Sequence, residues 1–462
     1  MANDSLVRSS ISSASFLVIL QLFSRIFTFA LNQALVRLVS PSAYGTAAIQ
    51  FELILNTILF LSREGVRNAL LRAGKDKTAG NPSVTNLSFL PIVLGIPLAL
   101  LMAGFYEAYA AEEVHSQPHF NLSIWIYALA ALVELLAEPM HNAAMSELRT
   151  DVRVKAEGLG VTSKTVITFL VLYYDSNRGS NGDLALFAFA LGQLTYSICV
   201  LMKYIHSYGF QSLHPNRRLV TKDNITPFLD PTLFRLSMSM TLQSLVKHFL
   251  TEGDKFILSW FSPLQDQGGY AVAMNYGSLI ARIGFQPIEE TLRVFFSRTL
   301  SSSQRPKKED LNIAARTLTS LVSVQISFSL FLVTFAPPYL PIVLRILLPP
   351  RYLDTSAPTV LQAWVYYIPL LAVNGGLEAF VSSVAKPSDL ARQSRYMALF
   401  SALYIATTIV FYKYTLLEDA SLVYANIVLL VLEFKTPFVL VESAATHAVL
   451  IVHRVIWDPD SC

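Results

Sequence analysis

The sequence predicts an all-α polytopic membrane protein with about twelve transmembrane helices in two parallel six-helix lobes. Of its 462 residues, 53% are hydrophobic and only 15% are charged. A soluble globular domain carries about 25% charged residues. Apolar segments of about 20 residues, long enough for a helix to cross the hydrocarbon core, recur along the chain. An ordered series of matching residues also relates the first two of these segments to the seventh and eighth.

The polar connections between the apolar segments are too short to fold as separate domains. The longest connection, roughly residues 203–230, is punctuated by Pro215 and Pro227. The predicted membrane spans are 12–39, 43–62, 86–109, 121–140, 157–174, 183–205, 231–261, 269–297, 312–336, 355–385, 389–413 and 417–445.

Basic residues concentrate in every second predicted loop. Clusters of Lys and Arg follow the second, fourth, sixth, eighth and tenth spans, and the other loops are poorer in them, except for Arg345 and Arg351. Because cytosolic loops carry the excess of Lys and Arg, both termini are expected to be cytosolic. The first residues lack the apolar core and cleavage site of a secretory signal peptide, so the first span is expected to remain as a helix.

The matching residues indicate an internal repeat. At an offset of 222, Gln21, Arg25, Asn32 and Ser40-Pro41 correspond to Gln243, Lys247, Asp254 and Ser262-Pro263. At an offset of 226, Tyr44, Glu64 and Arg67 correspond to Tyr270, Glu290 and Arg293. Parallel repeats are a known transporter plan, with the binding site between the halves near the midplane. The predicted parts are an N-terminal lobe at 1–205, a cytosolic linker at 206–230, a C-terminal lobe at 231–445 and a short cytosolic tail at 446–462.

Many charged residues fall within or at the ends of the predicted spans. A charge at mid-bilayer costs roughly 2.5–3.5 kcal/mol on insertion scales, so such residues usually face a partner or a water-filled cavity. The candidate cations of an anion-binding cleft between the lobes are Arg25, Lys164, Lys247, Lys255, Arg282, Arg63 and Arg67. The candidate polar or gating network around them is Glu64, Glu134, Glu138, Glu252, Asp254, Asn275, Glu289, Glu290 and Glu378.

Structural roles compete with this interpretation. Arg63 and Arg67 lie at cytosolic helix ends, where snorkelling also explains them. Three pairs at i,i+3 could neutralise each other locally, namely Glu64–Arg67, Glu252–Lys255 and Glu290–Arg293. Glu134 and Glu138 share a helix face and need a cation, a proton or water. His248 is expected to form an interhelical hydrogen bond rather than a proton relay.

The sequence contains no pattern typical of an enzyme. It has no G-x-x-x-x-G-K-[ST], H-E-x-x-H or G-x-S-x-G motif and no Cys/His zinc spacing. Glu252-Gly253-Asp254 could suggest the acidic signature of a membrane glycosyltransferase, but it falls inside a predicted span rather than in a luminal loop. We therefore predict a protein that is not an enzyme and needs no cofactor and no metal.

Four stretches carry a resemblance to a known family. They are FELILNTILFLSREGVRNALLR (51–72), ALVELLAEPMHNAAMSELRTDVRVKAEGLGVTSKTVITF (131–169), TEGDKFILSWFSPLQDQGGYAVAMNYGSLIARIGFQPIEETLRVFF (251–296) and YYIPLLAVNGGLEAFVSS (366–383). The chain resembles the Rft-type flippases, endoplasmic-reticulum proteins assigned to moving dolichol-linked oligosaccharides in N-glycosylation. The similarity covers most of residues 5–425 and weakens after Asn426. This family resembles MATE-type transporters and bacterial lipid-precursor flippases, which share two parallel six-helix lobes.

The resemblance implies a substrate and a place in the cell. The substrate would be dolichyl-pyrophosphate-linked Man5GlcNAc2, moved from the cytosolic to the luminal leaflet of the endoplasmic reticulum. The implied partners are this glycolipid, the membrane and the N-glycosylation machinery, with no nucleic acid. The alternative is a non-transporting scaffold that binds or presents the lipid-linked oligosaccharide. An exporter of small cationic drugs is less favoured, because the deep charges contain an excess of cations.

Overall fold

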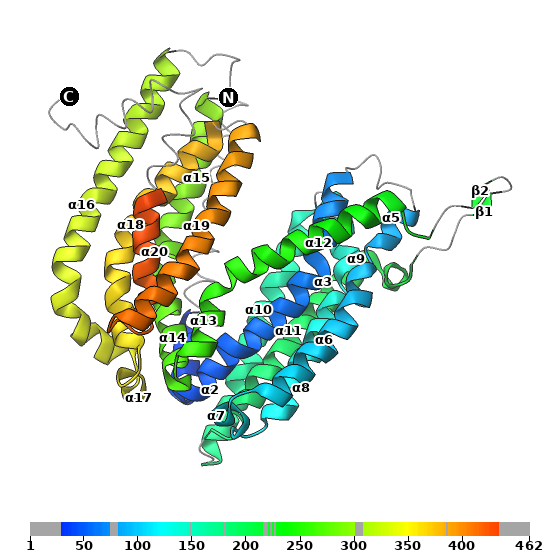
Figure 1. The fold of residues 1–462 in the computed structure, drawn as a ribbon, viewed down its shortest axis with the longest axis horizontal. Coiled ribbons are helices and arrows are strands. Elements are labelled where there is room, and N and C mark those ends of the chain that lie inside the picture. The colour runs from blue at the N-terminus through cyan, green and yellow to red at the C-terminus, as the bar shows by residue number, and fades with distance from the viewer. Residues whose placement is uncertain are drawn as a thin grey trace, which may run out of the picture. The chain divides into compact units, whose positions relative to one another are not determined.

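The computed structural model describes residues 29–433, except 74–81, 148, 180–181, 216–219, 222–223, 226–227, 301–307 and 385–386 (Figure 1). The chain forms two compact units, Met1–Gly268 and Gly269–Cys462. Arg25, most of the first predicted span and the tail at 446–462 lie outside the described residues.

The first unit is a helical bundle. After a helix at 29–38, its elements are α2 (Pro41–Gly45), the π-helix η1 (Thr46–Phe51), α3 (Glu52–Ala73), α5 (Pro82–Leu87), α6 (Leu90–Tyr109), α7 (Glu112–His115), α8 (Phe120–Leu135), α9 (Glu138–Ser146), α10 (Thr150–Asn177), α11 (Ala185–Tyr208), the 3-10 helix η2 (Phe210–Leu213), the strands β1 (Val220–Thr221) and β2 (Asn224–Ile225), α12 (Pro231–Thr251) and α13 (Gly253–Phe261). The two strands form a short antiparallel ladder. Helix α14 (Leu264–Ile280) crosses the division between the units.

Helix starts in the first unit follow sequence rules. Ser40 caps α2 by accepting a hydrogen bond from the Ala43 amide at 3.3 Å, and Pro41 occupies the first turn. Asp230 caps α12 in the same way, before Pro231. A polar cap followed by proline is favoured because the cap satisfies a free amide and proline has none to satisfy.

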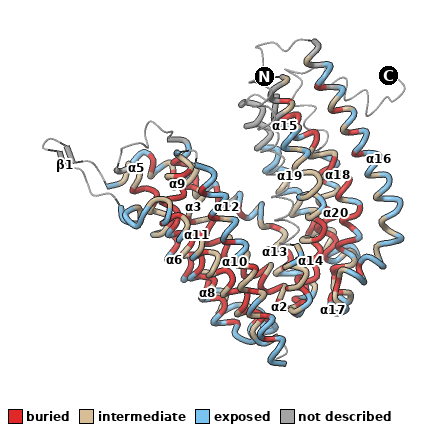
Figure 2. The backbone as a smooth tube through the Cα atoms, turned by 180° about the vertical axis from the view of Figure 1, so that it is seen from behind, coloured by how far each residue is buried: buried red, intermediate tan, exposed pale blue. Residues whose placement is uncertain are grey.

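The core of the first unit is apolar and aromatic. Phe51 packs against Phe120 and Tyr127, with ring centroids 5.9 and 5.0 Å apart. Helix α10 packs along α11, α11 along α8, and α12 along α3. Figure 2 shows the buried residues concentrated in helices such as α3 and α11. The close approach of α12 to α3 requires a glycine, since a Cβ at Gly65 would lie 2.1 Å from Thr241 Oγ1 and 2.7 Å from the Ser237 carbonyl oxygen.

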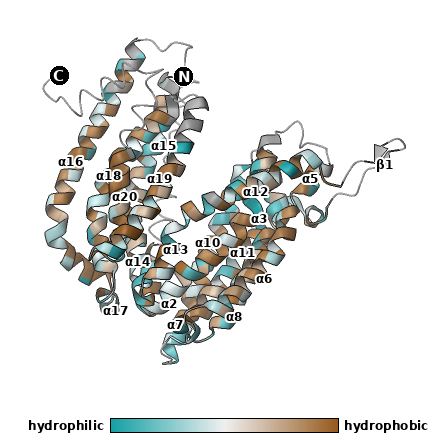
Figure 3. Cartoon of the chain, in the orientation of Figure 1, coloured by the Kyte–Doolittle hydropathy of each residue, from teal (hydrophilic) through white to brown (hydrophobic). Residues whose placement is uncertain are grey.

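The second unit is built around α18. Its elements after α14 are the π-helix η3 (Ala281–Phe285), α15 (Gln286–Leu300), α16 (Lys308–Leu347), α17 (Pro350–Leu353), α18 (Ala357–Val384), α19 (Pro387–Tyr414) and α20 (Ala420–Glu433). Helix α18 packs against α15, α16 and α20, and α19 packs against α20. Hydrophobic residues run along α16, α18 and α20 (Figure 3). Much of α16 is nevertheless exposed, including Leu330 and Phe331, as expected of a surface that faces lipid.

The predicted all-helical membrane fold is confirmed. Helices cover each predicted span from the second to the eleventh. Among the described residues, seven helical segments are long and apolar enough to cross a membrane: Pro41–Leu71, Val84–Tyr109, Phe120–Ser146, Ala185–Tyr208, Asn312–Leu347, Ala357–Val381 and Arg395–Tyr414. The total of twelve spans stays a prediction.

The predicted division into lobes also stays a prediction. The boundary between the compact units falls at Gly268, beyond the expected linker at 206–230, because α12 packs along α3. The predicted span 231–261 is divided into α12 and α13 at Glu252, which is the C-cap of the first helix and the N-cap of the second.

Candidate functional site

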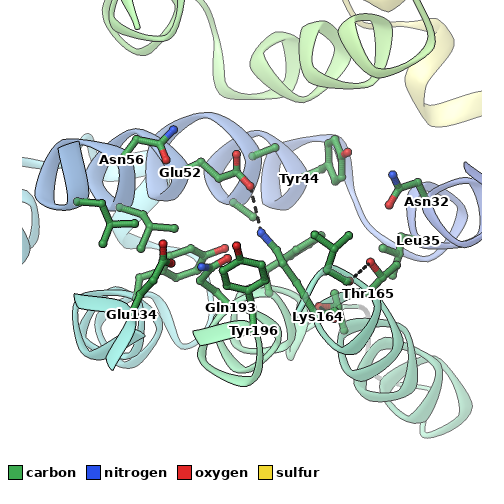
Figure 4. Close-up of a pocket in the computed structure, with 18 of the residues that line it drawn as sticks. Asn32, Leu35, Tyr44, Glu52, Asn56, Glu134, Lys164, Thr165, Gln193 and Tyr196 are labelled. Atoms are coloured by element: carbon green, nitrogen blue, oxygen red, sulfur yellow. Dashed lines mark hydrogen bonds and ion pairs between the residues drawn. The ribbon is translucent and has the colours of Figure 1, made fainter. Parts of the chain in front are cut away.

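The candidate site is a cavity of about 440 Å³ inside the first unit (Figure 4). Its walls come from the 29–38 helix, the α2–η1–α3 segment, α8, α10 and α11. The polar and aromatic residues that line it include Asn32, Tyr44, Glu52, Asn56, Arg63, Tyr127, Glu134, Lys164, Thr165, Gln193 and Tyr196. This is a polar interior in a bundle whose outer surface is largely apolar.

An ion pair crosses the cavity between α3 and α10. Lys164 Nζ lies 3.2 Å from Glu52 Oε1, and the two side chains are 26% and 39% exposed. Figure 4 shows the two groups pointing toward each other. Glu52 directly follows the π-helix η1, and π-helical turns are frequent at functional sites.

Close packing of α10 and α11 places the next polar residue. A Cβ at Gly192 would lie 2.1 Å from Thr168 Oγ1 and 3.0 Å from the Lys164 carbonyl oxygen. Only a glycine permits this approach, so α11 contacts α10 within a turn of Lys164. The adjacent residue, Gln193, then lines the cavity and is only 3% exposed.

A second, larger ion-pair cluster begins at the cavity wall. Arg63 Nη1 lies 2.7 Å from Glu134 Oε1 and 3.5 Å from Glu138 Oε1. Arg67 holds Glu138 with two hydrogen bonds, from Nε at 2.8 Å and from Nη2 at 2.5 Å. Such a two-pronged arginine–carboxylate contact fixes geometry as well as charge. The two guanidinium groups thus supply the countercharge that Glu134 and Glu138 require.

The two carboxylates of this cluster lie on either side of the break between α8 and α9. Helix α8 ends at Leu135, and α9 begins at Glu138 with Pro139 in its first turn. Both carboxylates face α3, where Arg63 and Arg67 bind them. The predicted local pair Glu64–Arg67 is wrong, because Arg67 binds Glu138 and Glu64 instead binds Lys247 at 3.3 Å.

The other predicted residues that the structure describes in the first unit lie on α3, α12 and α13 or at the junction of α12 with α13. The predicted Glu252–Lys255 pair is confirmed at 2.8 Å. Asn56 Nδ2 also donates a hydrogen bond to Glu252 Oε1 at 3.1 Å, and Asp254 lies in the first turn of α13.

The interhelical hydrogen bond expected of His248 is also confirmed. Its Nε2 lies 2.8 Å from Thr57 Oγ1. Because the Thr57 hydroxyl donates to the Leu53 carbonyl oxygen at 2.7 Å, the imidazole Nε2 must carry the proton in this contact.

Five predicted site residues belong to the second unit, namely Asn275, Arg282, Glu289, Glu290 and Glu378. Arg282 Nη2 donates to Asn275 Oδ1 at 3.1 Å. The predicted Glu290–Arg293 pair is wrong, since Arg293 binds Glu289 at 2.7 Å. Glu289 is one turn of helix from Arg293 at i,i+4, which is also a favourable spacing. The last predicted residue of this unit, Glu378, lies on α18 and is exposed.

The structure thus brings together only some of the predicted cations. Lys164 and Arg63 line one cavity, and each has a carboxylate partner. The expected cleft shared by both lobes stays a prediction. Sequence reasoning missed the neutral lining residues Asn32, Gln193 and Tyr196, because isolated amides and phenols in apolar helices carry no distinctive pattern.

Comparison with known proteins identifies the family. The family model for Rft protein matches residues 9–434. The chain belongs to the Rft protein family. One relative of the Rft family, the Man(5)GlcNAc(2)-PP-dolichol translocation protein RFT1 of Yarrowia lipolytica, is 36% identical over 92% of this chain and 68% of its own length. The protein of the same name from Saccharomyces cerevisiae is 30% identical over 93% of this chain and 82% of its own length.

Solved structures bear on the fold of this Rft family member. The lipid II flippase MurJ in an inward closed conformation aligns with a TM-score of 0.60 and 14% identity, over 96% of this chain and 91% of that chain. An inward-facing MATE family multidrug transporter aligns with a TM-score of 0.56 and 11% identity, over 93% and 99%. At these identities the likeness shows the fold, and it confirms the predicted MATE-like class.

Proposed function

We propose that this protein translocates dolichyl-pyrophosphate-linked Man5GlcNAc2 from the cytosolic to the luminal leaflet of the endoplasmic reticulum membrane, for protein N-glycosylation. The observation that carries the proposal is the cavity, which holds two ion pairs and several neutral hydrogen-bonding groups inside a bundle of apolar helices. A glycolipid needs a wet, polar route for its headgroup, while its polyprenol tail can stay in lipid. The names of the relatives in yeasts support this substrate.

The transport step involves no covalent chemistry. Its task is to lower the cost of carrying polar groups through hydrocarbon, where each unsatisfied group costs several kcal/mol. The proposed headgroup-binding residues are Arg25, Lys164, Lys247, Lys255, Arg282, Arg63 and Arg67. The proposed polar or gating network is Glu64, Glu134, Glu138, Glu252, Asp254, Asn275, Glu289, Glu290 and Glu378.

Reconstitution tests the proposal. The purified protein is placed in liposomes that contain the glycolipid, and a membrane-impermeant mannosidase measures how much of it reaches the outer leaflet with time. We expect the protein to speed the loss of protected glycolipid, compared with protein-free liposomes. If the protein binds the glycolipid without accelerating its exchange, the proposal fails and a scaffold that presents the oligosaccharide replaces it.

The orientation is part of the same proposal. The alternation of basic loops supports cytosolic termini, with the α6–α8 connection in the lumen. An N-glycosylation acceptor inserted after Ala111 should be modified in microsomes, and one added at either terminus should not be. Modification at a terminus would reverse the proposed orientation.

A further inference from the structure

The charged groups of the cavity already balance one another. Lys164 binds Glu52 at 3.2 Å and Arg63 binds Glu134 at 2.7 Å. These two cations and two carboxylates therefore add no net charge to the cavity wall. A diphosphate is an anion, and an anion placed in a low-dielectric site without an unmatched cation is costly. The cavity as built is poorly suited to a diphosphate.

Some neutral polar groups of the cavity, in contrast, are not engaged by the protein, although Asn56 and Thr165 are hydrogen-bonded. Within the part of the chain that the structure describes, the Gln193 amide and the hydroxyls of Tyr127 and Tyr196 have no hydrogen-bond partner. Gln193 is 3% exposed and Tyr127 is 1% exposed. Buried polar side chains are nearly always hydrogen-bonded, so groups like these call for water or a ligand. Both residues line the cavity.

We infer that this cavity receives the neutral, hydroxyl-rich sugar end of the lipid-linked oligosaccharide and leaves the diphosphate outside. The inference rests on the proposed function and specifies which part of the headgroup occupies this site. A sugar hydroxyl both donates and accepts hydrogen bonds, as do the Gln193 amide and the tyrosine hydroxyls. The carboxylates of Glu52 and Glu134 can accept further hydrogen bonds without losing their cations.

The shape of the cavity agrees with this ligand. Tyr44, Tyr127, Phe189 and Tyr196 place aromatic rings in its wall. All four rings offer broad contact area, and the three tyrosines add a polar hydroxyl. Its volume of about 440 Å³ is within the range of sites that enclose drug-sized ligands. Seven sugar rings exceed that size, so the cavity takes part of the glycan.

Two soluble probes separate a sugar site from an anion site. The full-length protein in lipid nanodiscs is titrated calorimetrically with the free Man5GlcNAc2 glycan, which has neither phosphate nor lipid, and with inorganic diphosphate. We expect the glycan to bind and inorganic diphosphate neither to bind in the cavity nor to compete. Failure of the glycan to bind, or its displacement by inorganic diphosphate, would overturn the inference.

Matched substitutions locate the binding. Q193L keeps the size of the side chain and removes its hydrogen bonds, so we expect the glycan affinity to fall about fivefold, the equivalent of about 1 kcal/mol. Y196F removes one hydroxyl, keeps the ring and should act in the same direction, and it serves if Q193L does not fold. The control Q211L makes the same change at an exposed position on η2. Equal affinity in Q193L, Y196F and Q211L would remove this cavity from glycan binding.

The outcomes distinguish this inference from the proposed function. If the glycan binds and responds to Q193L but liposomes show no exchange, translocation fails and the sugar site stands. If the protein accelerates leaflet exchange of the glycolipid but Q193L and Y196F leave the glycan affinity unchanged, the protein is a transporter and its sugar site lies elsewhere.

Discussion

Two of the ion-pair sites on helix α3 differ in burial and in connectivity. Near its start, Glu52 forms a single pair with Lys164, and both side chains are partly exposed to the cavity. About three turns later, Arg63 and Arg67 join Glu134 and Glu138 in a network whose Glu138 side chain is only 2% exposed. The open pair is accessible to a ligand that enters the cavity. A buried network has no such freedom, because each charge depends on the others.

The largest expected effect therefore belongs to the buried network. E138A removes the carboxylate that binds Arg67 and also lies near Arg63, so Arg67 loses its countercharge while Arg63 keeps Glu134. Breaking a buried pair in this way costs about 3–5 kcal/mol. We expect a steep loss of folded protein, measured as yield and melting temperature after detergent extraction.

A surface pair provides the matched control for E138A. Glu157 binds Arg153 at 2.8 Å, with 45% and 44% of their side chains exposed. E157A should change the free energy of unfolding by less than about 1 kcal/mol. If E138A and E157A lower the melting temperature by similar amounts, burial does not determine how much these ion pairs stabilise the protein.

A second prediction concerns the close contact of α12 with α3, on the same helix that carries the two arginines of the buried network. G65A places a methyl group 2.1 Å from Thr241 Oγ1 and 2.5 Å from the Thr241 amide nitrogen. The helix backbones must separate, and overpacking of this kind costs about 1–3 kcal/mol. The melting temperature should fall clearly.

The control for G65A is the same change at an open helical site. Gly158 has nothing within 4 Å of its would-be Cβ, so G158A should be neutral or stabilising by up to about 1 kcal/mol. A drop in G158A equal to that in G65A would show that helix propensity, and not the contact with α12, controls the result.

The sequence alone predicts the helices and the charged residues, and it fails on their partners. Glu252 and Lys255 are three residues apart in one predicted span, and this spacing is enough to predict that they pair. The true partners of Arg67 and Glu64 are 71 and 183 residues away in the sequence, and no local rule reaches that far. The spacing of Glu134 and Glu138 already places both on one face, but only the folded bundle shows that Arg63 and Arg67 bind them.

The neutral lining of the cavity was beyond prediction for a different reason. Gln193 and Tyr196 differ little from ordinary helix residues until α10 and α11 are packed together through Gly192. Charged residues stand out in apolar segments, so reasoning from the sequence centred the site on cations. The packed structure shows that the cavity cations are matched and that its unclaimed groups are uncharged.

The third prediction sharpens the open side of the comparison. E52Q removes the partner of Lys164 at nearly constant volume, so the cavity wall should gain one net positive charge. Because the pair is partly exposed, the loss in unfolding free energy should stay below about 1 kcal/mol. Inorganic diphosphate should then bind in the cavity, with calorimetry as the measurement. If inorganic diphosphate does not bind to E52Q, the charge balance of the cavity does not determine which ligand binds there.

The smallest effect is expected at Lys247, whose side chain is 63% exposed although it binds Glu64 at 3.3 Å. K247Q removes a long cation from an exposed pair, and exposed pairs contribute about 0–1 kcal/mol. Its melting temperature should match that of the parent within error. If the melting temperature of K247Q falls as far as that of E138A, the Lys247–Glu64 pair contributes to stability as much as the Arg67–Glu138 pair does. The pair between α3 and α12 would then count as structural.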